Sequence, residues 1–318
     1  MSTLKVSTLQ NASSATANIT LDASGNATVG GTLAMGSSFL RNRIINGAMA
    51  IDQRNAGASL SSGGGIVYSV DRWWFGSNGA ATTAQRVAGS GSTQYRLQIT
   101  GAASVTSVSL GQRIEAANSY DLAGSTVTLS FDMANSLLTS ASWTLSYANS
   151  TDSFGSLASP TITTISSGSV NITSTVTRYS VQITLPAAAT TGLQVQFGVG
   201  AQTSGTWTIG NVQLEVGSVA TPFERRQYGQ ELMLCQRYYE TGQLIIRNNG
   251  ASGFVYYWAT WAVPKRSGPT VAISGTTYSN GGSGGLNAPT TNGTEFFFNA
   301  SSTAAAFMQT NYSAASEL

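Results

Sequence analysis

The segment Tyr68–Phe75, which reads YSVDRWWF, places a carboxylate, a guanidinium group and several aromatic rings side by side. Aromatic rings can pack on the apolar C–H faces of sugars, and a carboxylate can hold sugar hydroxyls or a Ca²⁺ ion. Only 9% of the 318 residues are charged and 9% are aromatic, so this cluster stands apart from the surrounding Ser, Thr, Ala and Gly. It is either an anchor in a core or a platform for a ligand.

Neighbouring side chains in this segment cannot share a role if the segment is a strand. Trp73 and Trp74 are adjacent and would point to opposite faces. Asp71 and Arg72 would diverge in the same way, so we expect each to find a partner elsewhere in the structure. Structural pairing is the favoured interpretation, and a carboxylate that binds sugar or Ca²⁺ is the alternative. The candidate partners are Arg113, Glu115 and Glu215.

Two absences exclude most catalytic chemistry. The sequence has no histidine, and Cys235 is its only cysteine. These counts exclude disulfides within one chain, Cys/His zinc sites and nucleophiles activated by histidine. Glycan hydrolysis would need two carboxylates across one bond, and the long β-helical repeats usual in polymer-cleaving spikes are not found. We therefore expect no enzyme, no cofactor and no metal, with Cys235 as a small buried apolar residue.

Charge and hydropathy exclude two classes of partner. The net charge is +2, and the few charges are well mixed, so no basic stripe is present for nucleic acid or for a membrane surface. No apolar run approaches the length of a membrane span. The first residues, MSTLKVSTLQNASS, lack the charged and then apolar pattern of a signal peptide. We expect neither a nucleic-acid partner nor membrane insertion.

Alternating apolar and polar residues predict the elements that position the aromatic cluster. Gly and Ser/Thr are abundant, and turn-rich breaks separate the alternating runs, as in an antiparallel β-sandwich. In TWTIGNVQLEVG the alternation slips at Gly210-Asn211, which predicts a bulge of the kind that turns a corner in jelly rolls. The alternating runs are Tyr95–Ile99, Val127–Met133, Trp143–Tyr147, Tyr179–Leu185 and Leu193–Val199.

Between Gln227 and Glu240 the apolar residues recur with the period of a helix. The apolar stripe along this helix is wider than a single sandwich can cover, so we expect a second copy of the chain to pack on it. The stripe consists of Tyr228, Leu232, Cys235 and Tyr239, and is widened by Met233, Leu234 and Tyr238.

Two flanking regions complete the organisation. The run Gly253–Val263 is apolar on both faces, which predicts a strand that is buried on two sides or lies at an interface, within a small second β domain. Residues 1–40 contain two short alternating strands about a turn at Asp22 to Asn26, with side chains too small to form a core alone. This leader needs partners in order to be ordered.

Three motifs in this order resemble bacteriophage tail fibres and receptor-binding tail proteins. They are RNRIINGAMAIDQRNAG at Arg41–Gly57, YSVDRWWF, and GNVQLEVGSVATPFERRQYGQELMLCQRYYE at Gly210–Glu240. The resemblance implies an all-β homotrimer with a virion-attachment and oligomerisation segment (1–40) and a jelly roll similar to carbohydrate-binding modules (41–225). A helical connector at the trimer interface (226–241) and a small C-terminal β-sandwich (242–318) follow.

The resemblance also implies roles for individual residues. The family motif ends in DRW, so Trp73 is expected to anchor the core, while Trp74 can be either core or platform. Asp71, Arg72, Glu215 and Glu224 join Trp73 as structural residues of the motifs. The glycan-binding candidates are Trp74, Trp143, Tyr147, Tyr257 and Trp258, with Tyr256 and Trp261 as further aromatic candidates.

The function implied is that of a structural virion protein, located in the tail, that attaches the particle to a host glycan by multivalent, non-catalytic binding. Its expected partners are itself, phage tail or baseplate proteins through the N-terminal segment, and host surface polysaccharide or lipopolysaccharide. A connector or short fibre without a receptor site is the alternative. Glycan depolymerisation is the third and least favoured.

Overall fold

The protein is described from a computed structural model, in which residues 6–24, 27–29, 40–90, 93–250, 252–301 and 304–318 are described. The chain forms two compact units, Met1–Phe39 and Leu40–Leu318. In the first unit, β1 (Thr8–Leu9), β2 (Ile19–Leu21) and β3 (Ala27–Val29) form an antiparallel sheet in that order. The expected hairpin is confirmed, since Ile19 pairs with Val29 and Leu21 with Ala27.

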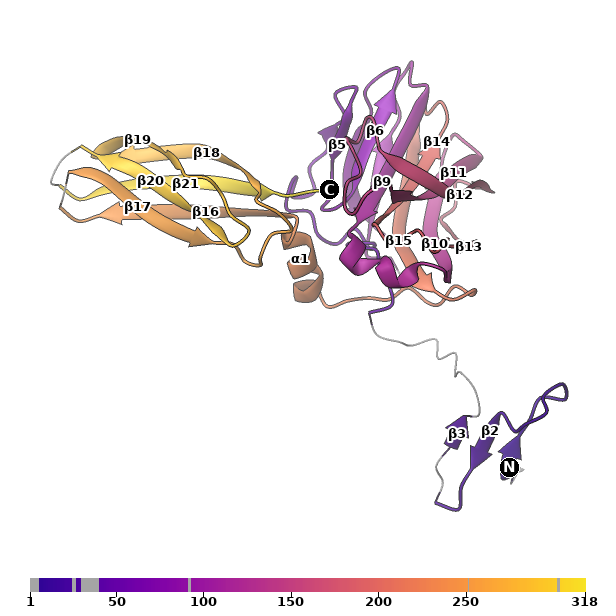
Figure 1. The fold of residues 1–318 in the computed structure, drawn as a ribbon. Helices are drawn as coiled ribbons and strands as arrows, with labels where there is room; N and C mark the ends of the chain where they lie inside the picture. Colours follow the sequence, from indigo (N-terminus) through magenta and orange to yellow (C-terminus); the bar gives the residue numbers. More distant parts are fainter. Residues whose placement is uncertain (1–5, 25–26, 30–39, 91–92, 251, 302–303) are drawn as a thin grey trace. The chain divides into compact units, whose positions relative to one another are not determined.

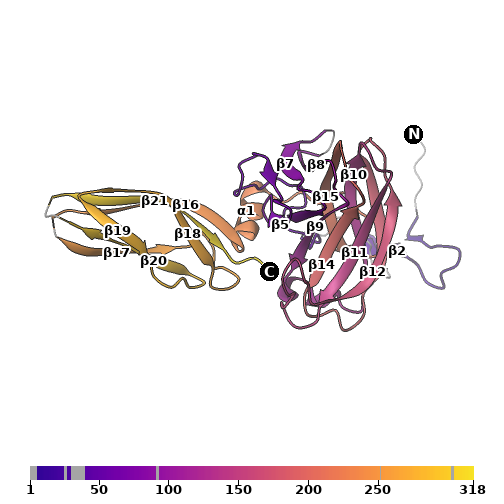
Figure 2. The same cartoon turned by 90° about the horizontal axis from the view of Figure 1, so that it is seen from above.

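The second unit begins with two six-stranded antiparallel sheets, visible from two directions in Figures 1 and 2. One sheet has the order β13-β10-β15-β8-β7-β4, and the other has the order β12-β11-β14-β9-β6-β5. The strands are β4 (Leu60–Ser61), β5 (Ile66–Tyr68), β6 (Trp74–Asn78), β7 (Thr83–Ala88), β8 (Tyr95–Thr100), β9 (Ser107–Ile114), β10 (Thr126–Asn135), β11 (Ser140–Ala148), β12 (Ile162–Asn171), β13 (Thr177–Thr184), β14 (Leu193–Val199) and β15 (Thr206–Val216).

The order of the last eight of these strands is that of a jelly roll. Counted from β8 as strand one to β15 as strand eight, the sheets read 6-3-8-1 and 5-4-7-2. This is the eight-stranded double Greek key, which the shorter strands β4 to β7 extend at one edge of each sheet. Two short 3₁₀ helices, Ala116–Asn118 and Tyr120–Leu122, follow β9.

The predicted alternation places one continuous core between the two sheets. Four of the five alternating runs fall wholly in strands, and the fifth, Tyr179–Leu185, extends one residue past β13. Their apolar positions, such as Leu129, Phe131 and Leu145, are buried in that core or pack against it. The predicted bulge is confirmed, because the pairing of β10 with β15 shifts between Ser130 and Asp132, and Asn211 adopts a φ of 47°. Asn tolerates this left-handed conformation better than most residues.

Helix α1 spans Tyr228–Gln236 and is shorter than the sequence predicted. Tyr239 is not on this helix, because it begins strand β16 and pairs with Ala315. Cys235 and Tyr238 are buried against Ile45 and Ile51 of the same chain, so the 45–51 segment covers part of the predicted stripe. Tyr228 and Met233 remain exposed, and Leu232 and Leu234 are half-buried. Among the described residues, no helix is long and apolar enough to cross a membrane.

A smaller β-sandwich follows the helix (Figure 1). Its sheets have the orders β16-β21-β18 and β17-β20-β19. Ile246, Phe296, Phe298 and Met308 lie in the core between them. The strands are β16 (Tyr239–Asn248), β17 (Gly253–Thr260), β18 (Thr270–Ser279), β19 (Gly281–Leu286), β20 (Gly293–Ala300) and β21 (Ala306–Ala315).

Candidate functional site

The two tryptophan candidates in the jelly roll are not available as platforms. Trp74 is only 2% exposed, and a Cβ added to Gly111 on the paired strand would lie 2.5 Å from its ring. Trp143 is likewise buried and lies across Gly168, while Tyr147 is half-buried against the core. A glycine on the neighbouring strand leaves the space that each indole fills. Trp74 and Trp143 are therefore packing residues, contrary to the glycan-binding hypothesis for them.

Trp73 lies in a turn and not on a strand. Its main-chain N–H donates to the carbonyl of Val70 at 3.0 Å, Arg72 has a φ of 73°, and β6 begins only at Trp74. The expectation that the two indoles point to opposite faces of one strand is wrong for this reason. Trp73 is fully buried, and its Nε1 donates to the carbonyl of Asn46 at 3.0 Å.

Asp71 and Arg72 find partners that the sequence did not indicate. The Asp71 carboxylate accepts the Gln53 main-chain N–H at 3.0 Å and the Gln53 amide at 2.5 Å. Burial raises the pKa of Asp71 to about 6, although the Gln53 donors oppose this shift. Arg72 pairs with Glu317, donates to the carbonyl of Arg113 at 2.5 Å and stacks 3.4 Å from the centre of the Tyr238 ring.

The predicted partners Glu115 and Glu215 bind other cations. Glu115 pairs with Arg237 at 3.1 Å, and Glu215 pairs with Arg41 at 3.3 Å. The partner Glu317 lies 245 residues from Arg72 in a segment without any motif, so spacing along the chain could not reveal it.

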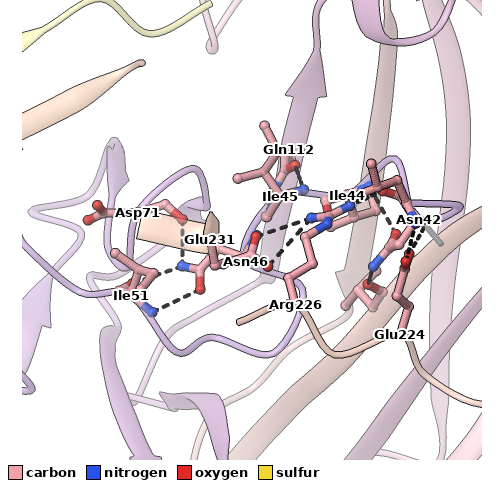
Figure 3. Close-up of polar contacts among 12 residues, drawn as sticks. Asn42, Ile44, Ile45, Asn46, Ile51, Asp71, Gln112, Glu224, Arg226 and Glu231 are labelled. Carbon is pink, nitrogen blue, oxygen red and sulfur yellow. Dashed lines mark hydrogen bonds and ion pairs between the residues drawn. The ribbon is translucent and has the colours of Figure 1, made fainter. Parts of the chain in front are cut away.

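The motif at Arg41–Gly57 and the motif at Gly210–Glu240 contact each other through a network of hydrogen bonds and ion pairs, drawn in Figure 3. Glu224 accepts the N–H of Asn42 at 2.7 Å, and Arg226 donates to the carbonyls of Asn42 and Ile44. Glu231 accepts the N–H of Asn46 at 2.5 Å and pairs with Arg226 at 3.2 Å. These contacts fix the segment after β15 on the loop before β4.

Exposed aromatic side chains gather on the outer face of strand β17. Phe254, Tyr256 and Trp258 alternate along the strand and are about half exposed, at 57%, 55% and 49%. Phe297 on β20 pairs directly with Tyr256, and its ring centre lies 6.0 Å from that of Tyr256 and 5.9 Å from that of Phe254. We call Phe254, Tyr256, Trp258 and Phe297 the aromatic face.

Polar side chains and glycines border the aromatic face. Glu295 pairs with Trp258 and Asn299 pairs with Phe254, so a carboxylate and an amide lie beside the rings. The Asn287 amide donates to Glu295 at 2.7 Å. A Cβ added to Gly285 on β19 would lie 3.2 Å from the Phe297 ring, so the absence of a side chain there lets the ring lie across the strand. Flat rings with amides beside them can pack on a sugar and hydrogen-bond its hydroxyls.

The remaining aromatic candidates have different places. Tyr257 is 48% exposed but alternates with the residues of the aromatic face, so it lies outside the same row. Trp261 is buried, and its Nε1 donates to the carbonyl of Thr290 at 2.9 Å. Of the two alternatives predicted for this strand, burial on both sides is wrong for β17, because Val255 and Ala259 are its only residues that pack on the small core among those described. A position at an interface stays a prediction.

Every one of the 13 carboxylates has a partner within the described residues. Eight form ion pairs: Asp52, Glu115, Asp121, Asp132, Glu215, Glu231, Glu240 and Glu317. Five accept hydrogen bonds: Asp22, Asp71, Asp152, Glu224 and Glu295. The described residues contain no cluster of acids or Cys235 that could hold a metal ion, and burial raises the pKa of the Cys235 thiol well above its usual range.

No family model and no curated protein matches this sequence. Among solved structures, a family 4 carbohydrate-binding module is 16% identical, with a TM-score of 0.35 over 54% of this chain and 98% of its own. A family 61 module in complex with β-1,4-galactotriose is 13% identical, with a TM-score of 0.35 over 56% and 99% of the two chains.

A third solved structure is the enzymatically active domain of tailspike protein 4 from bacteriophage CBA120. It is 13% identical, with a TM-score of 0.34 over 55% of this chain and 21% of its own. At these values the similarity identifies neither a ligand nor a function for this chain.

Proposed function

We propose that this protein is a phage tail fibre that binds a host surface glycan, without cleaving it, through the aromatic face. The observation that carries the proposal is the row of half-exposed rings on β17, which the partly buried Phe297 of β20 extends and the side chains of Glu295 and Asn299 border. Monomeric soluble proteins rarely leave such a contiguous apolar patch exposed unless it binds something. Rings held on a sheet lose little conformational freedom when a ligand binds.

Non-catalytic binding is supported by the state of the carboxylates. Hydrolysis of a glycosidic bond uses two carboxyl groups that face the substrate, one of them as an acid. Here the carboxylate on the aromatic face, Glu295, is held by the Asn287 amide, and every other one has a partner elsewhere in the chain. The aromatic face therefore offers packing and hydrogen bonding, and no pair of free acids.

The tail-fibre part of the proposal is supported by the three motifs and by the leader. In strands β1 and β2 every residue is exposed apart from half-buried Ile19, so these two strands bury no core between them. Attachment to other tail or baseplate proteins in the virion would cover them. Assembly of three chains would present three glycan sites on one body and raise the overall affinity by ~10²–10⁴.

Binding to isolated host polysaccharide or lipopolysaccharide tests the glycan proposal. We expect Trp258→Ala and Tyr256→Ala each to weaken binding about 10-fold, because loss of one stacking ring removes about 1–1.5 kcal/mol. Tyr120→Ala is the matched control, since Tyr120 is equally exposed but lies on a 3₁₀ helix of the jelly roll. Equal binding by all three variants and the wild type would show that the glycan does not bind at the aromatic face.

A connector without a receptor site is the second candidate, and the same exposed rings favour it, because protein interfaces are also rich in Tyr, Trp and Phe. The two candidates differ in which measurement Trp258→Ala changes. If the protein is a connector, Trp258→Ala weakens self-association or docking, and neither the variant nor the wild type binds polysaccharide. Shortening of the polymer during incubation would instead indicate a depolymerase.

A further inference from the structure

Glycines lie beneath two rings of the aromatic face. Trp258 lies across Gly293 of β20, since a Cβ added to this glycine would be 3.0 Å from the indole, and Phe297 lies across Gly285 of β19. Gly293 is buried, whereas Trp258 is 49% exposed. The indole therefore has one face covered by the strand and presents the other face to solvent.

The rings of β17 form a row along the strand. Phe254, Tyr256 and Trp258 occupy every second position, so they lie on the same side of the sheet. With a rise of about 3.3 Å per residue, the row from Phe254 to Trp258 is about 13 Å long. One sugar ring covers one aromatic ring, so a ligand that contacts the whole row must be a chain of sugars that runs along β17.

The sheet that carries the aromatic face contains one charged residue. Strands β17, β20 and β19 read GFVYYWAT, GTEFFFNA and GGSGGL, and Glu295 is their only acid or base. Arg247 lies on β16 of the other sheet. Lys265 pairs with Glu240, and Arg266 donates to main-chain carbonyls of the segment after β21. A carboxylate or phosphate on a ligand would therefore find no cation on this sheet and would meet the charge of Glu295.

Polar groups beside the rings are free to bind sugar hydroxyls. The Asn287 amide donates to Glu295 Oε2 at 2.7 Å, and Glu295 Oε1 accepts no hydrogen bond from a described residue. The Asn299 amide, the Tyr256 hydroxyl and Trp258 Nε1 likewise form no hydrogen bond within the part of the chain that the structure describes. An ionised carboxylate only accepts, so Oε1 can bind a hydroxyl donor but repels a second carboxylate.

We propose that the aromatic face binds an uncharged, linear glycan that runs along β17, and that Glu295 selects against acidic sugars. This inference rests on the proposed function and specifies its ligand. The apolar faces of successive sugars pack on the row of rings, and a hydroxyl of the sugar over Trp258 donates to Glu295, which pairs with Trp258 across the two strands. The same carboxylate disfavours chains that carry uronate, sialate or phosphate.

Calorimetric titration of the purified protein with matched sugars tests this specificity. The probes are gluco- and galacto-oligosaccharides, from the monosaccharide to the hexasaccharide, and the corresponding uronate oligosaccharides. Affinity of the wild type for a neutral series should rise at least about 10-fold from the monosaccharide to the tetrasaccharide, because the longer chain covers more rings. Each uronate oligosaccharide should bind at least about 10-fold more weakly than its neutral counterpart.

Three variants separate charge selection from loss of the whole face. Glu295→Gln keeps an oxygen acceptor but removes the charge, so the preference for neutral over uronate probes should fall below about 3-fold. Asp121→Asn is the matched control, because Asp121 is an exposed carboxylate on a 3₁₀ helix of the jelly roll, and it should keep the wild-type preference. Trp258→Ala should weaken binding of the neutral probes about 10-fold.

The outcomes distinguish this inference from the proposed function. Uronate probes that bind the wild type as tightly as neutral ones, or a preference unchanged in Glu295→Gln, would overturn selection by Glu295 and leave glycan binding at the aromatic face intact. Equal affinity for the monosaccharide and the tetrasaccharide would overturn the extended chain in the same way. If no probe binds, or if Trp258→Ala binds as tightly as the wild type, the proposed function fails and this inference fails with it.

Discussion

Glycines on the neighbouring strands decide what two of the indoles do. Gly111 lets Trp74 lie flat across β9, and Gly168 does the same for Trp143 on β12. Both side chains are therefore buried. By contrast, the rings on β17 have Phe297, Glu295 and Asn299 beside them, and no described residue covers them, so they stay exposed.

Trp73 and Trp258 should differ sharply in their contribution to stability. Trp73 is fully buried and hydrogen-bonded, so Trp73→Ala should lower the free energy of unfolding by about 3–5 kcal/mol. Trp258 is about half exposed, and Trp258→Ala should cost much less, about 1 kcal/mol. Denaturant unfolding followed by tryptophan fluorescence measures both. Similar losses for the two variants would contradict the assignment of Trp73 as the core anchor.

The buried Asp71 should make stability depend on pH. Burial raises its pKa from the usual 3.8 to about 6, so the folded state binds this proton more tightly than the unfolded state. The contribution is complete below pH 3.8 and is lost as the pH rises through 6, by on the order of 3 kcal/mol.

Unfolding by urea at pH 4, 5, 6 and 7 measures this dependence in the wild type and in Asp71→Asn. The variant cannot titrate at this position, so its stability should fall less between pH 4 and 7 than that of the wild type. Identical pH profiles would mean that Asp71 does not titrate in this range.

At the scale of elements, sequence patterns predicted strands and the bulge well, because period-two alternation and Gly210-Asn211 are local signals. The helix end was predicted less well. The spacing of Tyr239 fits the apolar stripe of the helix, but Tyr239 pairs with Ala315 on β21 and is therefore the first residue of β16. The turn at Arg72 was also missed, since a positive φ at arginine has no signal in the sequence.

The candidate site was predicted only in part. Trp258 is one of seven aromatic residues that the sequence offers as candidates for sugar binding. Phe254 and Phe297 were missed as members of the aromatic face, since they join Tyr256 only through the pairing of β17 with β20. Spacing along the sequence does not contain that register.

The segment after β21 should stabilise the jelly roll through the two ion pairs of Glu317. Glu317 pairs with Arg54 at 2.8 Å and with Arg72, which is almost fully buried. Glu317→Gln leaves the Arg72 charge without its partner and should cost about 3–5 kcal/mol. Glu295→Gln is the control, because the Glu295 carboxylate accepts a hydrogen bond from the Asn287 amide and forms no ion pair with any described residue, and it should cost less than about 1 kcal/mol. Thermal or urea unfolding that ranks the two variants equally would contradict this role.

At the scale of the whole molecule, we expect a homotrimer. Tyr228 and Met233 on α1 are large, apolar and exposed, as expected of a surface that another copy covers. Sedimentation should give a mass about three times 32.9 kDa. Tyr228→Ser combined with Met233→Ser should shift the equilibrium toward smaller species, while Tyr120→Ser should not. A stable monomer of the wild type would refute the trimer.

Adsorption of the purified protein to intact cells of a permissive host tests the central claim most directly. The account predicts that the wild type and Tyr120→Ala adsorb equally, and that Tyr256→Ala combined with Trp258→Ala reduces adsorption at least 10-fold, with the surface polysaccharide left at full length. Adsorption by the double variant at the wild-type level, or no adsorption by the wild type, would contradict it.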